Sequence, residues 1–154
     1  MPGVNYSNEI LTTLQTRLNL NATQIKQYLQ QLLDDLNKPF IPISIFNNKL
    51  TPLESIVKYL KEEKDLTLHE ISLILKRNEK NLWHTYTNTK KKYPSKLKSL
   101  KSELQIPLDI FSDKIPPMKT IVKYLHESKS LSYHDIGVLL KKNERTIWTS
   151  YNRK

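Results

Sequence analysis

The sequence contains no cysteine and only two glycines among its 154 residues. Without cysteine, the chain can form neither a disulfide nor a thiolate metal site, which fits a reducing compartment. Hydrophobic runs are also short, and none reaches the roughly 18–20 apolar residues that a membrane-spanning helix needs. The first ten residues, MPGVNYSNEI, lack the basic and apolar regions of a signal peptide. These absences predict a cytoplasmic protein that does not enter a membrane.

The parts of an enzyme active site are scarce as well. The chain has no glycine-rich phosphate loop, and its four histidines lack the paired spacing of metal ligands. His69–Glu70 and His134–Asp135 are adjacent pairs, whose side chains point in different directions on a helix. The sequence therefore predicts a protein that is not an enzyme, with no metal, no cofactor and no small-molecule substrate.

Acidic residues are outnumbered by basic ones. The chain has 25 Lys and Arg against 15 Asp and Glu, giving a net charge of +10. Residues 1–40 carry three charges of each sign, so the whole excess lies in residues 41–154. Such a balance favours a polyanionic partner, nucleic acid above all. A lysine-rich solubility surface, or the codon usage of an AT-rich genome, would give the same composition.

Residues 41–154 are built from one unit used twice. Residues 41–86 align with residues 106–151 without a gap, and 22 of the 46 positions are identical. Residue n of the first copy therefore corresponds to residue n + 65 of the second. A gapless unit of this length is too long for a solenoid turn and suits a three-helix domain. Each copy is predicted to open with an extended segment, residues 41–46 or 106–111, followed by three helices.

Capping residues mark where the predicted helices begin. Ser, Thr and Asn side chains accept hydrogen bonds from the first free N–H groups of a helix, and an acidic residue three positions later completes a capping box. The caps of this kind are Thr51 with Glu54, Thr67 with Glu70, Asn78, Ser132 with Asp135, and Asn143. The first helix of the second copy has only Pro116 and Pro117 at this place, which predicts a weaker start.

Residues 1–40 predict a separate N-terminal helical hairpin. Apolar residues recur there at helical spacing in two stretches, which Asn19–Asn21 separates. These residues are Ile10, Leu11, Leu14, Leu18, Ile25, Leu29, Leu32, Leu33 and Leu36. The apolar face that they form must be covered, either by the repeats or by a second copy of the hairpin. Residues 7–37 are therefore a candidate homodimer interface.

The segment between the copies is rich in lysine. Residues 93–105 are interpreted as a linker, in which Leu97, Leu100 and Leu104 would allow a short helix. Six lysines lie in or just before it: Lys90, Lys91, Lys92, Lys96, Lys98 and Lys101. Two interpretations remain open, a solvated linker and a basic strap along a phosphate backbone.

The second and third predicted helices have the residue types of a helix-turn-helix. Ser72 and Gly137 are small residues at the place where the third helix would cross the second. Residues 66–86, LTLHEISLILKRNEKNLWHTY, resemble the tri-helical family that includes sigma-factor region 4, with its form L-T/S-x-x-E-I-A-x-x-L-x-x-S-x-x-T-V. Both copies also resemble archaeal sigma-like helix-turn-helix proteins with an IPxSIF…IVKYLKE…RTIWTTY signature. The sequence departs from the first pattern in having Asn78 for the usual Ser and no glycine in the turn.

The resemblance implies an all-α protein with two tandem tri-helical helix-turn-helix domains, residues 41–92 and 106–154, after the N-terminal hairpin. In the docking mode of this family, the start of the third helix enters the major groove of DNA. The side chains that would then read bases are Lys80, Asn81, His84, Thr85, Arg145, Thr146, Thr149 and Ser150. Those expected at the phosphates are Arg77, Lys90, Lys91, Lys92, Lys96, Lys98, Lys141, Lys142 and Arg153.

Trp83 and Trp148 recur at equivalent positions. Each follows an apolar residue predicted to be buried, which favours packing at the margin of the core over the first helix. Stacking on a sugar or a base is the functional alternative.

The predicted function is sequence-preferring binding of double-stranded DNA by a nucleoid-associated regulator of transcription. If both domains docked together, the expected target would be two direct half-sites about one helical turn apart. Two alternatives stay open. One is sequence-independent packaging of the nucleoid or binding of RNA; the other is a sigma-like adaptor that docks on RNA polymerase.

Overall fold

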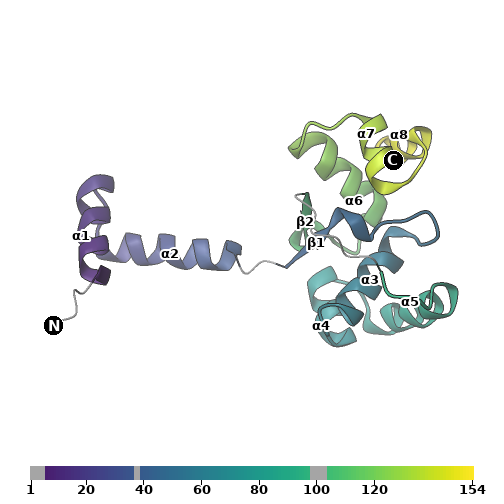
Figure 1. Cartoon of the computed structure of the whole chain (residues 1–154), viewed down its shortest axis with the longest axis horizontal. Coiled ribbons are helices and arrows are strands. Elements are labelled where there is room, and N and C mark those ends of the chain that lie inside the picture. The colour runs from purple at the N-terminus through teal and green to yellow at the C-terminus, as the bar shows by residue number, and fades with distance from the viewer. Residues whose placement is uncertain (1–5, 37–38, 98–103) are drawn as a thin grey trace. The chain divides into compact units, whose positions relative to one another are not determined.

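The computed structural model describes residues 6–36, 39–97 and 104–154, which belong to two compact units, Met1–Lys38 and Pro39–Lys154. The described residues are mostly helical, with eight α-helices and one two-stranded antiparallel sheet (Figure 1). The predicted helical character is therefore confirmed. The sheet was not predicted, although its strands, β1 (Phe40–Pro42) and β2 (Gln105–Pro107), open the segments expected to be extended. A 3₁₀ turn follows each strand, η1 (Ile43–Ile45) and η2 (Leu108–Ile110).

The first unit consists of two helices in contact, α1 (Tyr6–Leu18) and α2 (Ala22–Leu36). Asn19 joins them in the left-handed conformation, with φ 52°. A capping box begins α2, because the Asn21 Oδ1 accepts from the Gln24 N–H and the Gln24 Oε1 accepts from the Asn21 N–H, both at 2.9 Å. Ile25 of α2 is buried, with 3% of its surface exposed.

The second unit contains three helical elements from each copy. The first copy forms α3 (Pro52–Glu62), α4 (Leu68–Leu75) and α5 (Glu79–Lys92). The second forms α6 (Pro117–Lys123), which continues into the π-helical turn η3 (Tyr124–Ser128), then α7 (Tyr133–Leu140) and α8 (Glu144–Asn152). The predicted side-chain caps are all present, and Pro116 gives α6 no such cap, as expected. The capping box is complete at Thr51 and Thr67, whereas at α7 the Ser132 hydroxyl, and not its N–H, donates to the Asp135 carboxylate.

Equivalent apolar residues of the two copies build one core. They come from the inward faces of the helices, and each is no more than 1% exposed. They are Ile56, Val57, Leu60, Ile71, Leu75 and Leu82, with their equivalents Ile121, Val122, Leu125, Ile136, Leu140 and Ile147. Burial of this size supplies the main free energy that holds the helices together.

The sheet joins the copies symmetrically. Ile41 lies opposite Ile106, which is its own equivalent in the second copy. The Ile43 N–H donates to the Leu104 carbonyl at 3.2 Å, and the equivalent Leu108 N–H donates to the Pro39 carbonyl at 3.0 Å. Exchanging the two copies therefore maps this ladder of bonds onto itself.

Packing beyond the sheet is reciprocal as well. Helix α4 of the first copy contacts η2 of the second, while α7 of the second contacts η1 of the first. The two equivalent helices α3 and α6 contact each other between these pairs. The copies thus share a core about a pseudo-two-fold axis.

The segment after α5 is only partly described. Leu97 is buried and Leu104 is half-buried. The connecting helix predicted between them, with Lys98 and Lys101, lies outside the described residues.

Candidate nucleic-acid interface

The turn between α4 and α5 has the same backbone geometry as the turn between α7 and α8. Lys76 and Lys141 end the preceding helices in the left-handed conformation, with φ 53° at both. The following N–H groups close the turn, because Arg77 donates to the Ser72 carbonyl at 3.0 Å and Lys142 to the Gly137 carbonyl at 2.9 Å. A lysine thus takes the place of the usual glycine, at a cost of about 1 kcal/mol.

A small residue is needed where the helices of each pair approach. A Cβ atom on Gly137 would lie 2.8 Å from the Lys142 carbonyl oxygen and 3.5 Å from the Glu144 nitrogen. In the first copy Ser72 occupies this place, and its hydroxyl donates to the His69 carbonyl at 2.6 Å. The close approach that requires a small residue is therefore confirmed at position 137, and at position 72 it stays a prediction.

In both copies an exposed histidine of the second helix contacts a glutamate of the third helix, and the sequence did not predict this contact. The His69 Nδ1 lies 3.2 Å from the Glu79 Oε2, and the His134 Nδ1 lies 3.6 Å from the Glu144 Oε2. Each contact joins the first turn of one helix to the first residue of the next. The only signal in the sequence was that both residues recur in the second copy.

Helix α5 exposes most of its predicted base readers. Lys80, Asn81 and His84 are exposed, whereas Thr85 is half-buried and its hydroxyl donates to the Asn81 carbonyl at 3.0 Å. The His84 ring stands edge-on to the Trp83 ring, with the centroids 5.0 Å apart. Lys80, Asn81 and His84 are therefore the predicted base readers of α5 whose side chains are exposed.

Helix α8 presents a different set at the equivalent places. Arg145, Thr146 and Thr149 are exposed, and Ser150 is half-buried. The Thr149 hydroxyl donates to the Arg145 carbonyl at 2.8 Å, and the Ser150 hydroxyl donates to the Thr146 carbonyl at 2.7 Å. These hydroxyls keep acceptor lone pairs, but their protons are engaged by the helix. Arg145 is thus the principal donor on this helix.

The predicted phosphate contacts fall into three groups. Five of these residues are exposed, namely Lys90, Lys91, Lys96, Lys141 and Arg153. Lys142 is half-buried, and Lys98 lies outside the described residues. The Lys92 Nζ instead pairs with the Glu54 Oε2 at 3.0 Å, which ties the end of α5 to the start of α3. Burial acts to raise the pKa of the Glu54 carboxyl, but the Thr51 N–H and the Lys92 ammonium outweigh it and lower that pKa.

Arg77 contacts the other copy. Its Nη2 lies 3.2 Å from the Ser112 carbonyl oxygen and 3.4 Å from that of Ile115. The side chain is half-buried in the turn between α4 and α5. Its guanidinium therefore helps to join the copies in this structure.

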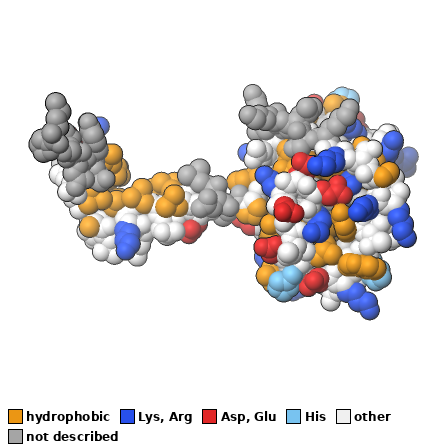
Figure 2. Space-filling model, turned by 60° about the horizontal axis from the view of Figure 1, so that its bottom comes forward, with side chains coloured by type: hydrophobic (Ala, Val, Ile, Leu, Met, Phe, Trp, Pro, Cys, Tyr) orange, Lys and Arg blue, Asp and Glu red, His pale blue; other side chains and the backbone are white. Residues whose placement is uncertain are grey.

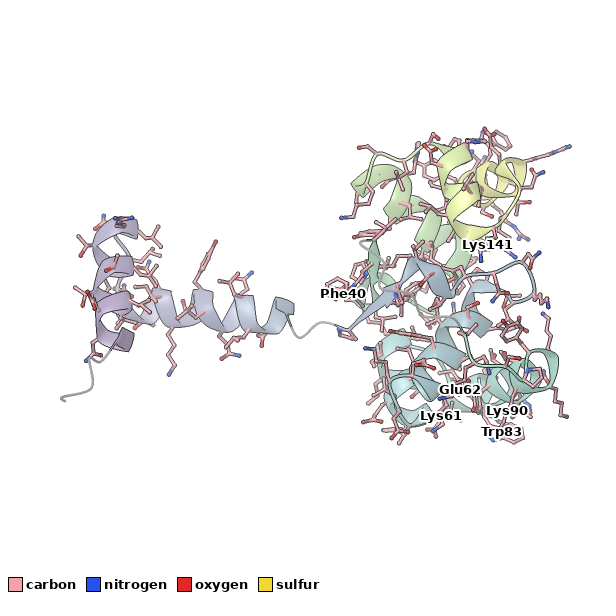
Figure 3. All side chains as sticks on the ribbon, in the orientation of Figure 1. Phe40, Lys61, Glu62, Trp83, Lys90 and Lys141 are labelled. Atoms are coloured by element: carbon pink, nitrogen blue, oxygen red, sulfur yellow. The ribbon has the colours of Figure 1, made fainter. Side chains whose placement is uncertain are left out.

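The expected packing role of the two tryptophans is wrong. Trp83 is 52% exposed and Trp148 is 55% exposed. Trp83 lines a groove of about 580 Å³ together with side chains from the end of α3, the start of α4 and the later turns of α5 (Figure 3). The other residues of this wall include Lys61, Leu68, Tyr86, Lys90 and Lys91. An aromatic face beside three lysines is suited to a sugar–phosphate chain.

Comparisons with known protein families, with curated proteins and with solved structures find no match to this chain. Among the described residues, no helix is both long enough and apolar enough to cross a membrane. The same residues hold no group of three or more His, Asp or Glu side chains that could bind a metal ion.

Proposed function

We propose that this protein binds double-stranded DNA with sequence preference through two helix-turn-helix units, α3–α5 and α6–α8. Helices α5 and α8 would enter the major groove as recognition helices, and the protein would act in transcriptional regulation. The resemblance of both copies to sigma-like helix-turn-helix domains supports the proposal, as does the net charge of +10.

One observation carries the proposal: two helix pairs with the same turn, caps and core expose different polar side chains on the second helix of each pair. Lysine and arginine can donate to guanine, and asparagine can pair with adenine through two hydrogen bonds. Asn81 is exposed in the first copy and Thr146 replaces it in the second. Two readers on one scaffold would account for this pattern.

The test is a competition between selected and scrambled duplexes. The full chain is first used to enrich sites from a random duplex library at about physiological salt. The variant Lys80→Ala/Arg145→Ala is then compared with Lys64→Ala/Lys129→Ala, a matched control at two equivalent exposed lysines outside the predicted interface. We expect the first variant to lose about tenfold or more of its preference for the selected duplex. The control should keep that preference.

Two outcomes would contradict the proposal in different ways. Tight binding with no enriched sequence would indicate a packaging protein, and equal discrimination by both variants would remove α5 and α8 as the readers. Absence of duplex binding would favour the adaptor or RNA-binding alternative.

The N-terminal hairpin is proposed to form a homodimer. Hydrophobic side chains form a stripe along it (Figure 2). The exposed members are Ile10, Leu11, Leu18, Tyr28, Leu29, Leu32 and Leu33. A stripe of this kind on two amphipathic helices is suited to pairing with an identical surface. Light scattering should give a molar mass of two chains for the full protein. The variant Leu29→Gln/Leu33→Gln should have the molar mass of one chain. A wild-type protein with the mass of one chain would refute the proposal.

A further inference from the structure

The two copies are related by a rotation, and this rotation constrains the relative orientation of the two half-sites in a DNA target. Ile41 pairs with its own equivalent, Ile106, and the contacts of α4 with η2 and of α7 with η1 are exchanged when the copies are exchanged. A directly opposite pair of equivalent residues in antiparallel strands lies on a local two-fold axis. The copies are thus related by a rotation of about half a turn, as in a symmetric dimer.

The same rotation relates α5 to α8. Figure 1 shows β1 and β2 at the left edge of this unit, and α5 and α8 at its right edge on either side of the middle. Lys141, which ends α7, lies at the right of the unit near its middle (Figure 3). Both candidate recognition helices therefore lie on the side of the unit away from the sheet in this view.

From this arrangement we propose that the protein binds an inverted, pseudo-palindromic DNA site, as a dimer contained in one chain. The proposal rests on the proposed DNA-binding function and specifies its target. Duplex DNA has two-fold axes that relate its strands, and a two-fold protein that binds along one of them reads the half-sites in opposite directions. Direct half-sites, which tandem domains on a flexible linker would accept, do not match this symmetry.

The two halves of the site differ in sequence. The exposed residues Lys80, Asn81 and His84 of α5 stand where α8 has Arg145, Thr146 and Thr149. Each half-site would therefore have its own bases, and the site would have a defined polarity. One chain could then bind such a site in one orientation only, which an ordinary homodimer with identical readers does not achieve.

Making the two readers alike tests the symmetry directly. In the variant Arg145→Lys/Thr146→Asn/Thr149→His/Ser150→Thr, α8 carries the four reader residues of α5. The reciprocal variant, Lys80→Arg/Asn81→Thr/His84→Thr/Thr85→Ser, gives α5 those of α8. Each full-length variant is used for selection from a random duplex library, next to the wild type. All eight substituted residues are exposed or half-buried, so both variants should fold.

The symmetry of the enriched motif gives the answer. We expect each variant to select a true inverted repeat, which it binds about a hundredfold more tightly than the same half-sites in direct orientation. A direct repeat, or a single half-site without a partner, would overturn the inference but leave the proposed function standing. Binding with no enriched motif, or no binding by the wild type, would instead refute the proposed function.

A disulfide across the sheet gives a second measurement. The bonds from Ile43 to Leu104 and from Leu108 to Pro39 leave Phe40 and Pro107 as a non-hydrogen-bonded pair, whose Cα atoms are about 4.5 Å apart in such ladders. This separation suits a disulfide, and the chain has no cysteine to compete. We expect oxidised Phe40→Cys/Pro107→Cys to bind the selected site within about threefold of its reduced form. A loss of tenfold or more on oxidation would show that the copies must separate to bind, and would overturn the inference.

Discussion

The two copies have the same scaffold but differ in the environment of one lysine. Lys58 of α3 is fully buried, and its Nζ pairs with the Glu62 Oε1 at 2.8 Å. The equivalent Lys123 of α6 is exposed. Both Glu62 and its equivalent Glu127 accept a hydrogen bond from a tyrosine of the third helix of their copy, Tyr86 of α5 or Tyr151 of α8.

The first helices of the two copies also differ in the contacts of their first turn. The Lys92–Glu54 ion pair and the Lys49 ammonium over the Tyr93 ring bring the segment after α5 against the start of the first copy. Glu54 lies one turn before Lys58 on the same face of α3. In the second copy Lys119 replaces Glu54 and donates to the Arg153 carbonyl. Identical residues can thus have different burial when their neighbours differ.

The largest effect should come from breaking the buried pair. Glu62→Gln leaves the fully buried Lys58 ammonium without its counter-charge, which costs about 3 kcal/mol of the free energy of unfolding. The matched variant Glu127→Gln, beside the exposed Lys123, should cost less than about 1 kcal/mol. Urea unfolding of both variants measures this contrast. Equal losses would show that the two copies do not differ here.

The crossing of the helix pairs should give the next largest contrast. Gly137→Ala places a Cβ atom against the Lys142 carbonyl, a backbone atom that cannot move freely. We expect a net loss of about 1 kcal/mol in spite of the better helix propensity of alanine. Ser72→Ala, at the equivalent place, removes one local hydrogen bond and should change the free energy of unfolding by less than about 0.5 kcal/mol. A stabilised Gly137→Ala would contradict the close approach.

Relieving the left-handed turns should have a smaller effect in the opposite direction. Lys76→Gly and Lys141→Gly should each raise the free energy of unfolding by about 0.5–1 kcal/mol, since glycine adopts φ 53° without strain. Lys142→Gly is the control, because Lys142 does not have a positive φ. Lys142→Gly should therefore not raise the free energy of unfolding. Thermal unfolding of the three variants compares them, and a gain in the control would disprove the explanation.

The smallest effect concerns pH. The N–H and hydroxyl of Thr67 bond to the Glu70 carboxylate and lower its pKa below the ordinary 4.5. A carboxyl with a lowered folded-state pKa stabilises the fold above its unfolded pKa, and this contribution is lost as the pH falls through the folded value. Glu70→Gln should therefore make the loss of stability below about pH 4.5 less steep. Parallel curves for variant and wild type between pH 3 and pH 7 would refute this.

The local structure could be predicted from the sequence because its signals are local. Thr67 and Asn78 mark the starts of their helices because their side chains bond to N–H groups three positions later. The spacing of Ile71 and Leu75 predicts the buried face of α4. The exposure of Lys80 followed from the same periodicity. These predictions needed no knowledge of the second copy.

The contact between the copies could not be predicted in this way. A repeat shows that two units will look alike, but three-residue strands and a shared core depend on partners 65 positions away. Arg77 was expected at a phosphate because it is basic and lies in a turn, yet it donates to carbonyls of the other copy. Trp83 was expected to pack at the margin of the core because it follows the buried Leu82, yet it is 52% exposed.

The central claim is that α5 and α8 together meet DNA. The most direct measurement is amide chemical-shift mapping of the full chain while a selected duplex is added. The account predicts that the largest changes fall at residues 79–85 and 144–150, with smaller ones at Lys90 and Lys91. Changes confined to the hairpin or to the sheet, or to only one of the two helices, would contradict it.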